Sequence, residues 1–329
     1  MMNLLTVSGS PHIHGNQNVK KIMWQVVLAL MPAMLVSFWY FGLSAILLTV
    51  ISVTGAVVVE YLIAKFLLKT TPTVGDGSAV ITGLLLAFNV PSSLPWWEML
   101  IGVTFAIGVA KMAYGGLGKN PFNPAIAGRI FMLVSFPVDM TTWPKPGLPF
   151  NTLNFSVDGL TGPTSLGILK ERVGENISSI SAQLPDYMTM FIGEKGGSLG
   201  EVSAAAIILG GLFLLFRRII SWHIPISFLL SAFVFAGILY LVDDTQYINP
   251  MFHLLAGGLM LGAFFMATDM VTSPMSKTGQ IVFGVGCGLL TILIRVWGAY
   301  PEGVSFAILI MNAFTPLINK MFKPKSFGR

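Results

Sequence analysis

The sequence predicts an all-α polytopic membrane protein with about ten membrane-spanning helices. Hydrophobic residues make up 54% of its 329 residues and charged residues only 10%, whereas a soluble domain carries roughly 25% charged residues. The mean hydropathy is +0.77. Apolar runs of near-spanning length recur on both sides of one polar stretch. We therefore expect lipid, rather than water, to surround most of the helices.

The apolar runs predict the individual helices. The first set is 22–41, 44–67, 78–90, 96–114 and 123–137; after the polar stretch 138–198 come 199–216, 224–242, 251–267, 280–297 and 304–321. The third and fifth runs are short for a bilayer that needs about 20 residues, as expected where protein surrounds the helix ends. These runs divide the chain into a first membrane repeat, 1–137, an extracytoplasmic loop, 138–198, and a second membrane repeat, 199–329.

The basic residues predict the orientation. If the N-terminus is cytoplasmic, the connections on that side hold most of the positive charge, as the positive-inside rule requires. They carry Lys20, Lys21, Lys65, Lys69, Lys111, Lys119, Arg217, Arg218 and Lys277, and the C-terminus adds Lys320, Lys323, Lys325 and Arg329. The net charge of +5 thus reflects membrane topology, and we expect no binding to nucleic acid.

The two halves of the chain resemble each other in outline. Residues 78–95 and 252–274 both combine a Gly-containing apolar run with a later Pro. Five helices per half is an odd number, so the halves would lie in opposite orientations, and such inverted repeats place ligands near the midplane at interrupted helices. This arrangement also suits a transporter or channel for a small neutral solute.

Residues 158–166, Asp-Gly-Leu-Thr-Gly-Pro-Thr-Ser-Leu, form the first candidate site. By composition alone this is a turn-rich loop with several hydroxyl groups. Thr164 has a glycine two residues before it, which gives the backbone freedom for a close approach.

Residues 114–125 form the second candidate and contain Asn120-Pro121 and Asn123-Pro124. Asn is a good N-cap and Pro suits the first helical turn, so a helix should begin near Asn123. Capping accounts for Asn123 but less well for Asn120. Both amides are also able to hydrogen-bond the polar edge of a bound neutral ring.

Other polar residues lie in or beside apolar runs. Asp269 lies two residues after the run 251–267, where it would sit either at the membrane interface or in a site. Arg129, Arg295 and Glu60 lie within runs, and their partners and roles stay open. His12 and His14 have no further clustered ligands, so we expect no metal site. The single cysteine, Cys287, allows neither a disulfide nor a cysteine-ligated iron–sulfur cluster within the chain.

These motifs resemble those of the flavin-carrying membrane subunits of Rnf complexes and of Na⁺-pumping NADH:quinone reductases. The segment 158–166 is similar to their flavinylation motif, with Pro163 in place of the usual Ala. The resemblance implies FMN joined to Thr164 through a phosphoester, attached by a flavin transferase. It also implies noncovalent riboflavin near Asn120, Asn123 and Asp269, although Met270 replaces the usual Pro. The N-terminal His run and the absence of a long N-terminal extension favour the D-subunit type of the Rnf complexes.

The resemblance further implies a fold similar to urea transporters, in a prokaryotic cell membrane with both termini cytoplasmic. The expected function is electron relay between ferredoxin and NAD, coupled to translocation of Na⁺ or H⁺. Expected partners are iron–sulfur subunits and an extracytoplasmic subunit that carries FMN; this chain would hold no catalytic residue of its own. A B-type subunit of the quinone reductase and a small-solute channel are the alternatives. The sequence does not distinguish Na⁺ from H⁺.

Overall fold

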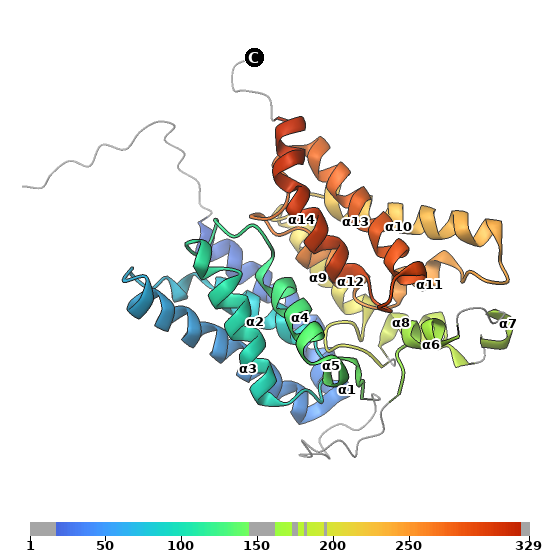
Figure 1. Cartoon of the computed structure of the whole chain (residues 1–329), viewed down its shortest axis with the longest axis horizontal. Coiled ribbons are helices and arrows are strands. Elements are labelled where there is room, and N and C mark those ends of the chain that lie inside the picture. The colour runs from blue at the N-terminus through green and yellow to red at the C-terminus, as the bar shows by residue number, and fades with distance from the viewer. Residues whose placement is uncertain (1–17, 145–161, 173–176, 181–182, 194–195, 324–329) are drawn as a thin grey trace, which may run out of the picture.

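The computed structural model describes residues 18–144, 162–172, 177–180, 183–193 and 196–323, which are mostly helical (Figure 1). Five helical stretches are long and apolar enough to cross a membrane: Val19–Leu67, Trp96–Tyr114, His223–Val242, Lys277–Trp297 and Val304–Met321. Three apolar helices are shorter: Ser78–Phe88, Pro124–Ser135 and Ala204–Phe216. The prediction of an all-α, multi-pass membrane protein is confirmed.

Helix α1 (Val19–Leu62) contains the first two predicted runs as two arms. They meet at Gly42, whose φ of 63° and ψ of −143° lie outside the helical region. A positive φ is accessible to glycine at little cost because glycine has no Cβ. The second arm continues as the π-helix η1 (Ile63–Leu67).

The rest of the first half is built from shorter helices. They are η2 (Val74–Asp76), α2 (Ser78–Phe88), α3 (Trp96–Thr104), the π-helix η3 (Phe105–Val109), η4 (Met112–Tyr114), α4 (Pro124–Ser135) and α5 (Pro137–Thr141). As predicted, Asn123 caps α4 and Pro124 is its first residue. In its described residues, the connection to the second half contains the short helices α6 (Ser165–Glu171), α7 (Ile177–Ile180) and α8 (Tyr187–Ile192).

The second half begins with α9 (Ala204–Phe216) and α10 (His223–Val242) and ends with α13 (Lys277–Trp297) and α14 (Val304–Met321). The predicted single run 251–267 is instead a broken helix: α11 (Pro250–Leu255), α12 (Leu259–Leu261) and the π-helix η6 (Gly262–Met266). The break falls at Ala256, which is extended, and at Gly257, whose φ is 65°.

Two charged side chains satisfy the backbone groups that this break exposes. Arg295 donates through Nη1 to the carbonyl oxygen of His253, at 2.6 Å, and through Nη2 to that of Ala256, at 2.9 Å. The carboxylate of Glu302 accepts the N–H of Gly258. Unpaired backbone groups are costly within a membrane, so these contacts allow the helix to be interrupted there. The buried position of Arg295 thus has a structural cause.

Small residues let neighbouring helices approach closely. A Cβ added to Gly284 or Gly288 of α13 would lie 1.9 or 2.0 Å from the hydroxyl oxygens of Ser227 and Ser231 on α10. A Cβ added to Gly210 of α9 would lie 2.0 Å from the carbonyl oxygen of Ala29 on α1. Close packing at small residues is a general way to hold membrane helices together, because the hydrophobic effect does not drive helices together within lipid.

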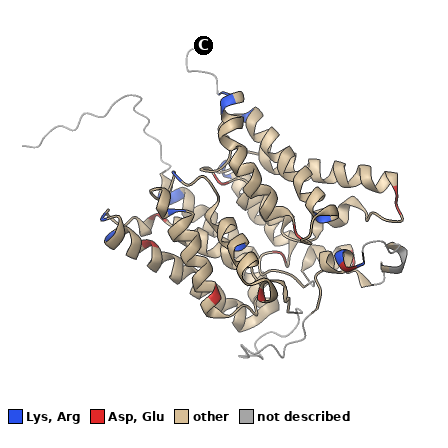
Figure 2. Cartoon of the chain, viewed as in Figure 1, with Lys and Arg blue, Asp and Glu red and all other residues tan. Residues whose placement is uncertain are grey.

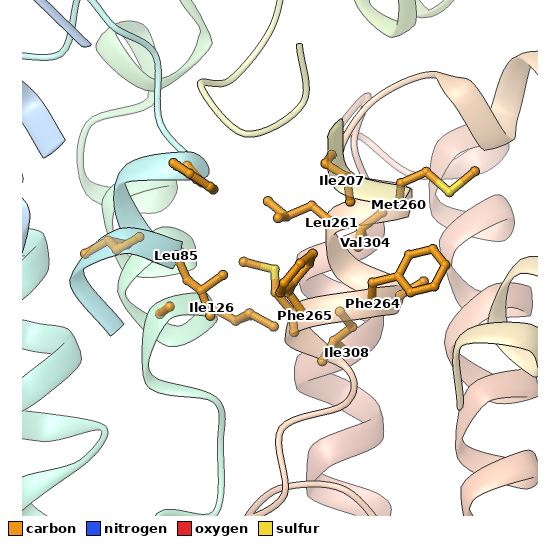
Figure 3. Close-up of a cluster of buried hydrophobic side chains, with 14 of the residues drawn as sticks. Leu85, Ile126, Ile207, Met260, Leu261, Phe264, Phe265, Val304 and Ile308 are labelled. Atoms are coloured by element: carbon orange, nitrogen blue, oxygen red, sulfur yellow. The ribbon is translucent and has the colours of Figure 1, made fainter. Parts of the chain in front are cut away.

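The apolar core joins the two halves (Figure 3). Leu85 of α2 and Ile126 of α4 come from the first half. The members of the same cluster from the second half belong to α9, α12, η6 and α14: Ile207, Leu261, Phe264, Phe265, Val304 and Ile308. The halves therefore fold against each other as one unit.

Charged residues are sparse along the helices and gather near helix ends (Figure 2). The two described ends of the chain lie at the same end of the bundle. Ile22 and Met23 border the cavity next to residues 268–271, while Thr315 of α14 donates to the carbonyl oxygen of Thr272, at 2.9 Å.

Candidate functional site

Two cavities lie toward opposite ends of α4. The first, which we call the Asn123 cavity, has a volume of about 90 Å³ and is bordered by the starts of α1, α2 and α4 and by residues 268–271. The second, the Thr164 cavity, has a volume of about 300 Å³. It is bordered by the C-terminal part of α4, the start of α6 and residues 300–306. Each predicted site residue borders one of the two.

The Asn123 cavity brings together three predicted residues: Asn120, Asn123 and Asp269. The Oδ1 atom of Asn123 accepts the N–H of Ala125, at 3.0 Å, so it serves as the cap of α4. Its Nδ2 donates, at 3.2 Å, to the carbonyl oxygen of Met266, which is the last residue of η6. One amide thus fixes a helix start in the first half to a helix end in the second.

The other two predicted residues are held mainly by local contacts. Asn120 is buried, and its Nδ2 donates to the carbonyl oxygen of Phe122, at 3.0 Å. Asp269 is half-buried, and its Oδ2 accepts the hydroxyl of Thr272, at 3.0 Å. Both side chains border the cavity with further hydrogen-bonding capacity, since an amide and a carboxylate each offer more sites than these contacts use.

A buried ion pair beside this cavity was not predicted. Lys111 and Glu60 are each 2% exposed, and Lys111 Nζ lies 2.5 Å from Glu60 Oε2. Lys111 also donates to the hydroxyl of Ser78, at 2.7 Å, and borders the cavity. The positive-inside rule treats Lys111 as one of the basic residues that set the orientation. Its position near the end of the run 96–114 nevertheless indicates burial, because a membrane-embedded cation needs a partner. Glu60 is that partner.

π-Helices precede the polar walls of the Asn123 cavity. Helix η3 ends at Val109, two residues before Lys111, and η6 ends at Met266, two residues before Thr268. A π-helical turn widens the backbone and occurs often at functional sites. Here both such turns direct the chain from a packed helix into the cavity wall.

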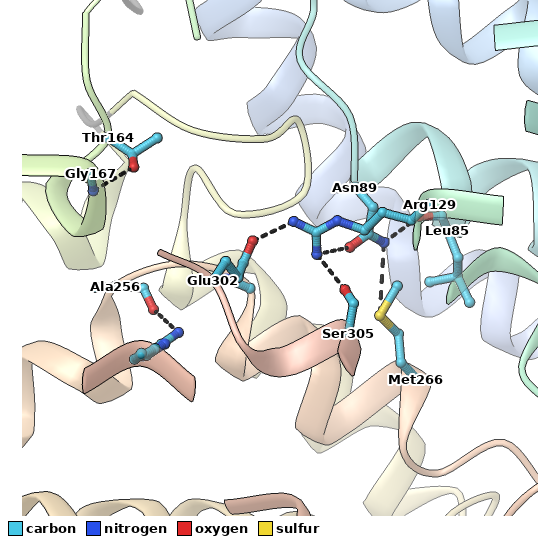
Figure 4. A network of polar contacts seen from close by, with 11 residues as sticks. Leu85, Asn89, Arg129, Thr164, Gly167, Ala256, Met266, Glu302 and Ser305 are labelled. Atoms are coloured by element: carbon cyan, nitrogen blue, oxygen red, sulfur yellow. Dashed lines mark hydrogen bonds and ion pairs between the residues drawn. The ribbon is translucent and has the colours of Figure 1, made fainter. Parts of the chain in front are cut away.

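Thr164 lies at the rim of the larger cavity. It is the N-cap of α6, and its Oγ1 accepts the N–H of Gly167, at 3.0 Å (Figure 4). Its side chain is half-buried, whereas Leu166 is buried against the core. Asp158 and Thr161 of the same motif lie outside the described residues. Thr164 therefore presents its hydroxyl at the rim of the cavity.

The walls of the Thr164 cavity are partly aromatic and partly charged. Trp143, Tyr300 and Phe306 supply flat apolar surface, and the rings of Tyr300 and Phe306 stack with their centroids 5.2 Å apart. Charged side chains come from α4, α6 and the connections before α9 and α14: Arg129, Lys170, Glu171, Glu201 and Glu302. Flat aromatic walls with a few polar groups are typical of sites for planar ligands.

Arg129 connects the two cavities through polar contacts (Figure 4). It pairs with Glu302 and donates to Asn89 Oδ1, at 3.1 Å. Asn89 Nδ2 in turn contacts Met266 Sδ, at 3.8 Å, and the carbonyl of Met266 accepts from Asn123. The sequence left the partner of Arg129 open, and the structure pairs it with the carboxylate of Glu302.

Among the residues that the structure describes, there is no group of three or more His, Cys, Asp or Glu side chains that could hold a metal ion. His12 and His14 lie outside those residues, so the sequence remains the sole basis for the expectation about them.

The sequence matches the family described as NQR2, RnfD, RnfE over residues 6–328. It is 44% identical to the D subunit of the proton-translocating ferredoxin:NAD(+) oxidoreductase complex of Clostridium ljungdahlii, covering 99% of this chain and 97% of that protein. It is also 44% identical to the D subunit of the Na(+)-translocating ferredoxin:NAD(+) oxidoreductase complex of Acetobacterium woodii, covering 98% and 95%. The D subunit of the ion-translocating oxidoreductase complex of Stutzerimonas stutzeri is 41% identical, covering 95% and 93%. This chain therefore belongs to the NQR2, RnfD, RnfE family.

Proposed function

We propose that this chain is the D-type membrane subunit of an ion-translocating ferredoxin:NAD⁺ oxidoreductase complex, in which it relays electrons through flavins. The observation that carries the proposal is the position of Thr164: a half-buried hydroxyl at the mouth of a cavity with aromatic walls, in a segment that resembles a flavinylation motif. The near full-length similarity to subunits named for such complexes supports it.

FMN attached to Thr164 fits the residues around it. A phosphoester on Oγ1 needs an accessible hydroxyl, and Thr164 provides one beside Lys170, whose positive charge suits a phosphate. The volume of about 300 Å³ is at the lower end of ligand pockets. Trp143 and Tyr300 offer flat faces for the ring system. A flavin transferase would join the cofactor to the hydroxyl.

Riboflavin at the Asn123 cavity is the second part of the proposal. Asn120, Asn123 and Asp269 would hydrogen-bond the polar edge of its ring, and Lys111 adds a cation to that set. The cavity volume of about 90 Å³ is smaller than that of most ligand pockets. Binding there requires wall side chains to move outward, and the exposed side chain of Met270 is placed to do so.

The proposed architecture consists of two inverted repeats of five helices, 1–137 and 199–329, similar to urea transporters and separated by the loop 138–198. The shared position of the two described chain ends supports it. With the termini in the cytoplasm of a prokaryotic cell, the Asn123 cavity faces the cytoplasm and the Thr164 cavity faces outward. The Thr164 side would then exchange electrons with a subunit that carries FMN, and iron–sulfur subunits would complete the relay.

In this mechanism the flavins supply one- and two-electron chemistry, and the protein supplies position and electrostatics. Thr164 anchors one cofactor and the aromatic walls orient it. The Arg129–Glu302 pair borders the Thr164 cavity. Leu85 and Phe265 of the apolar core border the Asn123 cavity, so packed side chains lie between the two. This separation favours an electron relay over an open solute channel, because electrons cross packed protein whereas a solute needs a continuous path.

The test is covalent flavin itself. When the complex is produced with its flavin transferase, the denatured chain should fluoresce in a gel, and Thr164→Val should abolish that signal completely. Thr141→Val is the matched control, because Thr141 borders the same cavity and its hydroxyl contacts the backbone of α5. A dark wild-type chain, or a fluorescent Thr164→Val chain, would refute the assignment of Thr164.

A further inference from the structure

The cavity at Thr164 contains buried charges that attachment of a cofactor does not use. Three of them surround the break between α11 and α12: Arg129, Glu201 and Glu302. Arg295 lies behind the same break, where its Nη2 would be 2.9 Å from a Cβ added to Gly257. Two guanidinium groups and two carboxyl groups thus gather around one backbone turn.

Glu302 is fully engaged in this cluster. One of its carboxylate oxygens accepts from Arg129 and the other from the N–H of Gly258. Arg129 also donates through Nη1 to Asn89 and to Ser305, whose Oγ is 2.6 Å away. These contacts fix the pair between the halves, so Glu302 is poorly placed to change its protonation.

Glu201 differs from Glu302 in its contacts. It is 5% exposed and borders the cavity, but its Oε1 has no hydrogen-bond partner within the described part of the chain. A Cβ added to Gly258 would lie 3.1 Å from this oxygen and 2.9 Å from Glu302 Oε1, so both carboxyl groups flank the same glycine. A buried carboxylate oxygen without a hydrogen-bond partner costs free energy. Binding a proton removes the negative charge of Glu201, so this carboxyl group is suited to take one up.

We propose that Glu201 takes up one proton when the first electron reaches the ring at Thr164. The inference rests on the proposed function, because it needs a redox cofactor in this cavity. The step is balanced: an electron donor of the same complex supplies the electron, water at the outer face supplies the proton, and a new O–H bond converts the Glu201 carboxylate to a carboxylic acid. Reoxidation of the ring reverses both transfers.

The charge balance gives the physical reason. Arg129, Arg295 and Lys170 offset Glu201, Glu302 and Glu171, which are the described charged groups that face Glu201 or border the cavity. An added electron leaves one unpaired negative charge in a site shielded from water, and the phosphodiester would add another. Uncompensated charge is expensive there, and a proton on Glu201 removes it.

The local environment sets the pH range of this coupling. Glu201 lies in the connection before α9, outside the spanning helices, where burial and the neighbouring Glu302 raise its pKa to about 7. Below that pH the group is protonated before any electron arrives and takes up nothing. Coupling is therefore expected from about pH 7 upward and should fade as the pH falls.

Infrared difference spectroscopy of the assembled complex, reduced minus oxidised, tests this directly. We expect a carboxylic acid C=O band that appears on reduction at pH 8, weakens toward pH 6 and disappears in Glu201→Gln. The carbonyl bands of the ring occur both in the wild type and in Glu201→Gln, so they cancel when the reduced-minus-oxidised spectrum of the variant is subtracted from that of the wild type. Glu98→Gln is the matched control, because Glu98 of α3 is also a buried carboxyl group, 2% exposed, with an oxygen that lacks a partner in the described part, but it lies away from the cavity.

The fluorescence of the denatured chain separates this inference from the proposed function. If the flavin is on Thr164 and the wild type shows no carboxylic acid band on reduction, or Glu201→Gln keeps it, the role of Glu201 is wrong and the relay stands. If no covalent flavin is present, the proposed function itself fails. Glu201→Asp should retain a shifted band, which guards against a variant that only misfolds.

Discussion

The Asn123 cavity and the Thr164 cavity lie toward the two ends of one short helix, α4, yet they are built differently. The Asn123 cavity is bordered by helix starts and by a buried ion pair, and its volume is about 90 Å³. The Thr164 cavity is bordered largely by connections between helices and has about 300 Å³. Contacts between distant segments hold both cavities, but the first is lined by the buried amides of Asn120 and Asn123, whereas the second presents the half-buried hydroxyl of Thr164 at its rim.

This difference teaches how one scaffold can suit two modes of cofactor binding. A covalent bond keeps its ligand even where the walls are connections and the cavity is open. A noncovalent ligand depends on complementary polar groups held rigidly, because binding must outweigh the lost freedom of every group that it orders. Buried amides and an ion pair meet that need at the Asn123 cavity.

The largest expected effect comes from breaking the ion pair at the Asn123 cavity. Lys111→Met leaves Glu60 buried without its partner, and removal of one member of a buried pair costs about 3–5 kcal/mol. Thermal unfolding of the purified chain in detergent should show this loss. The covalent flavin at Thr164 should remain in the folded fraction, because the other cavity does not use Lys111.

The double variant Lys111→Met/Glu60→Gln is the control for that experiment. It removes both charges, so much of the lost stability should return, as it does when buried pairs are replaced together. If the single and double variants are equally unstable, Lys111 acts through packing rather than through its charge, and our account of this cavity is wrong.

A smaller effect is expected from Asn123→Ala. The change removes the cap of α4, at about 1 kcal/mol, and also the amide that reaches the carbonyl of Met266. Asn249→Ala removes a similar Asn-Pro cap from α11 at an exposed position. Asn249→Ala should lose only the stability of a cap, and Asn123→Ala should lose more. Only Asn123→Ala should lose noncovalent riboflavin, measured by extraction from the purified complex. Equal riboflavin contents would argue against this cavity as the site.

The smallest effect is expected from Asp269→Asn. The amide can keep both contacts, because its oxygen accepts the N–H of Val271 and its NH2 group can donate to the hydroxyl oxygen of Thr272. Stability should therefore change by no more than about 0.5 kcal/mol. Riboflavin content should fall less than in Asn123→Ala. A loss as large as that of Asn123→Ala would show that the negative charge of Asp269, rather than its shape, holds the ligand.

The sequence predicted well what depends on local chemistry. Hydropathy located the apolar runs because exclusion from water acts on each segment separately. The cap at Asn123 followed from Asn-Pro, and the break at Gly42 separated two runs already distinguished by composition. Resemblance to known motifs pointed to Thr164 and to the three residues that the structure brings to one cavity.

The tertiary structure alone decided what depends on pairing between distant segments. Lys111 pairs with Glu60, which is 51 positions away in the sequence, and Arg129 pairs with Glu302, which is 173 positions away. A buried charge requires a partner, but the sequence does not say which one, since many arrangements of helices would supply a carboxylate. The break at residues 256–258 escaped prediction for the same reason, because Arg295 and Glu302, far along the chain, are what make an interrupted helix stable there.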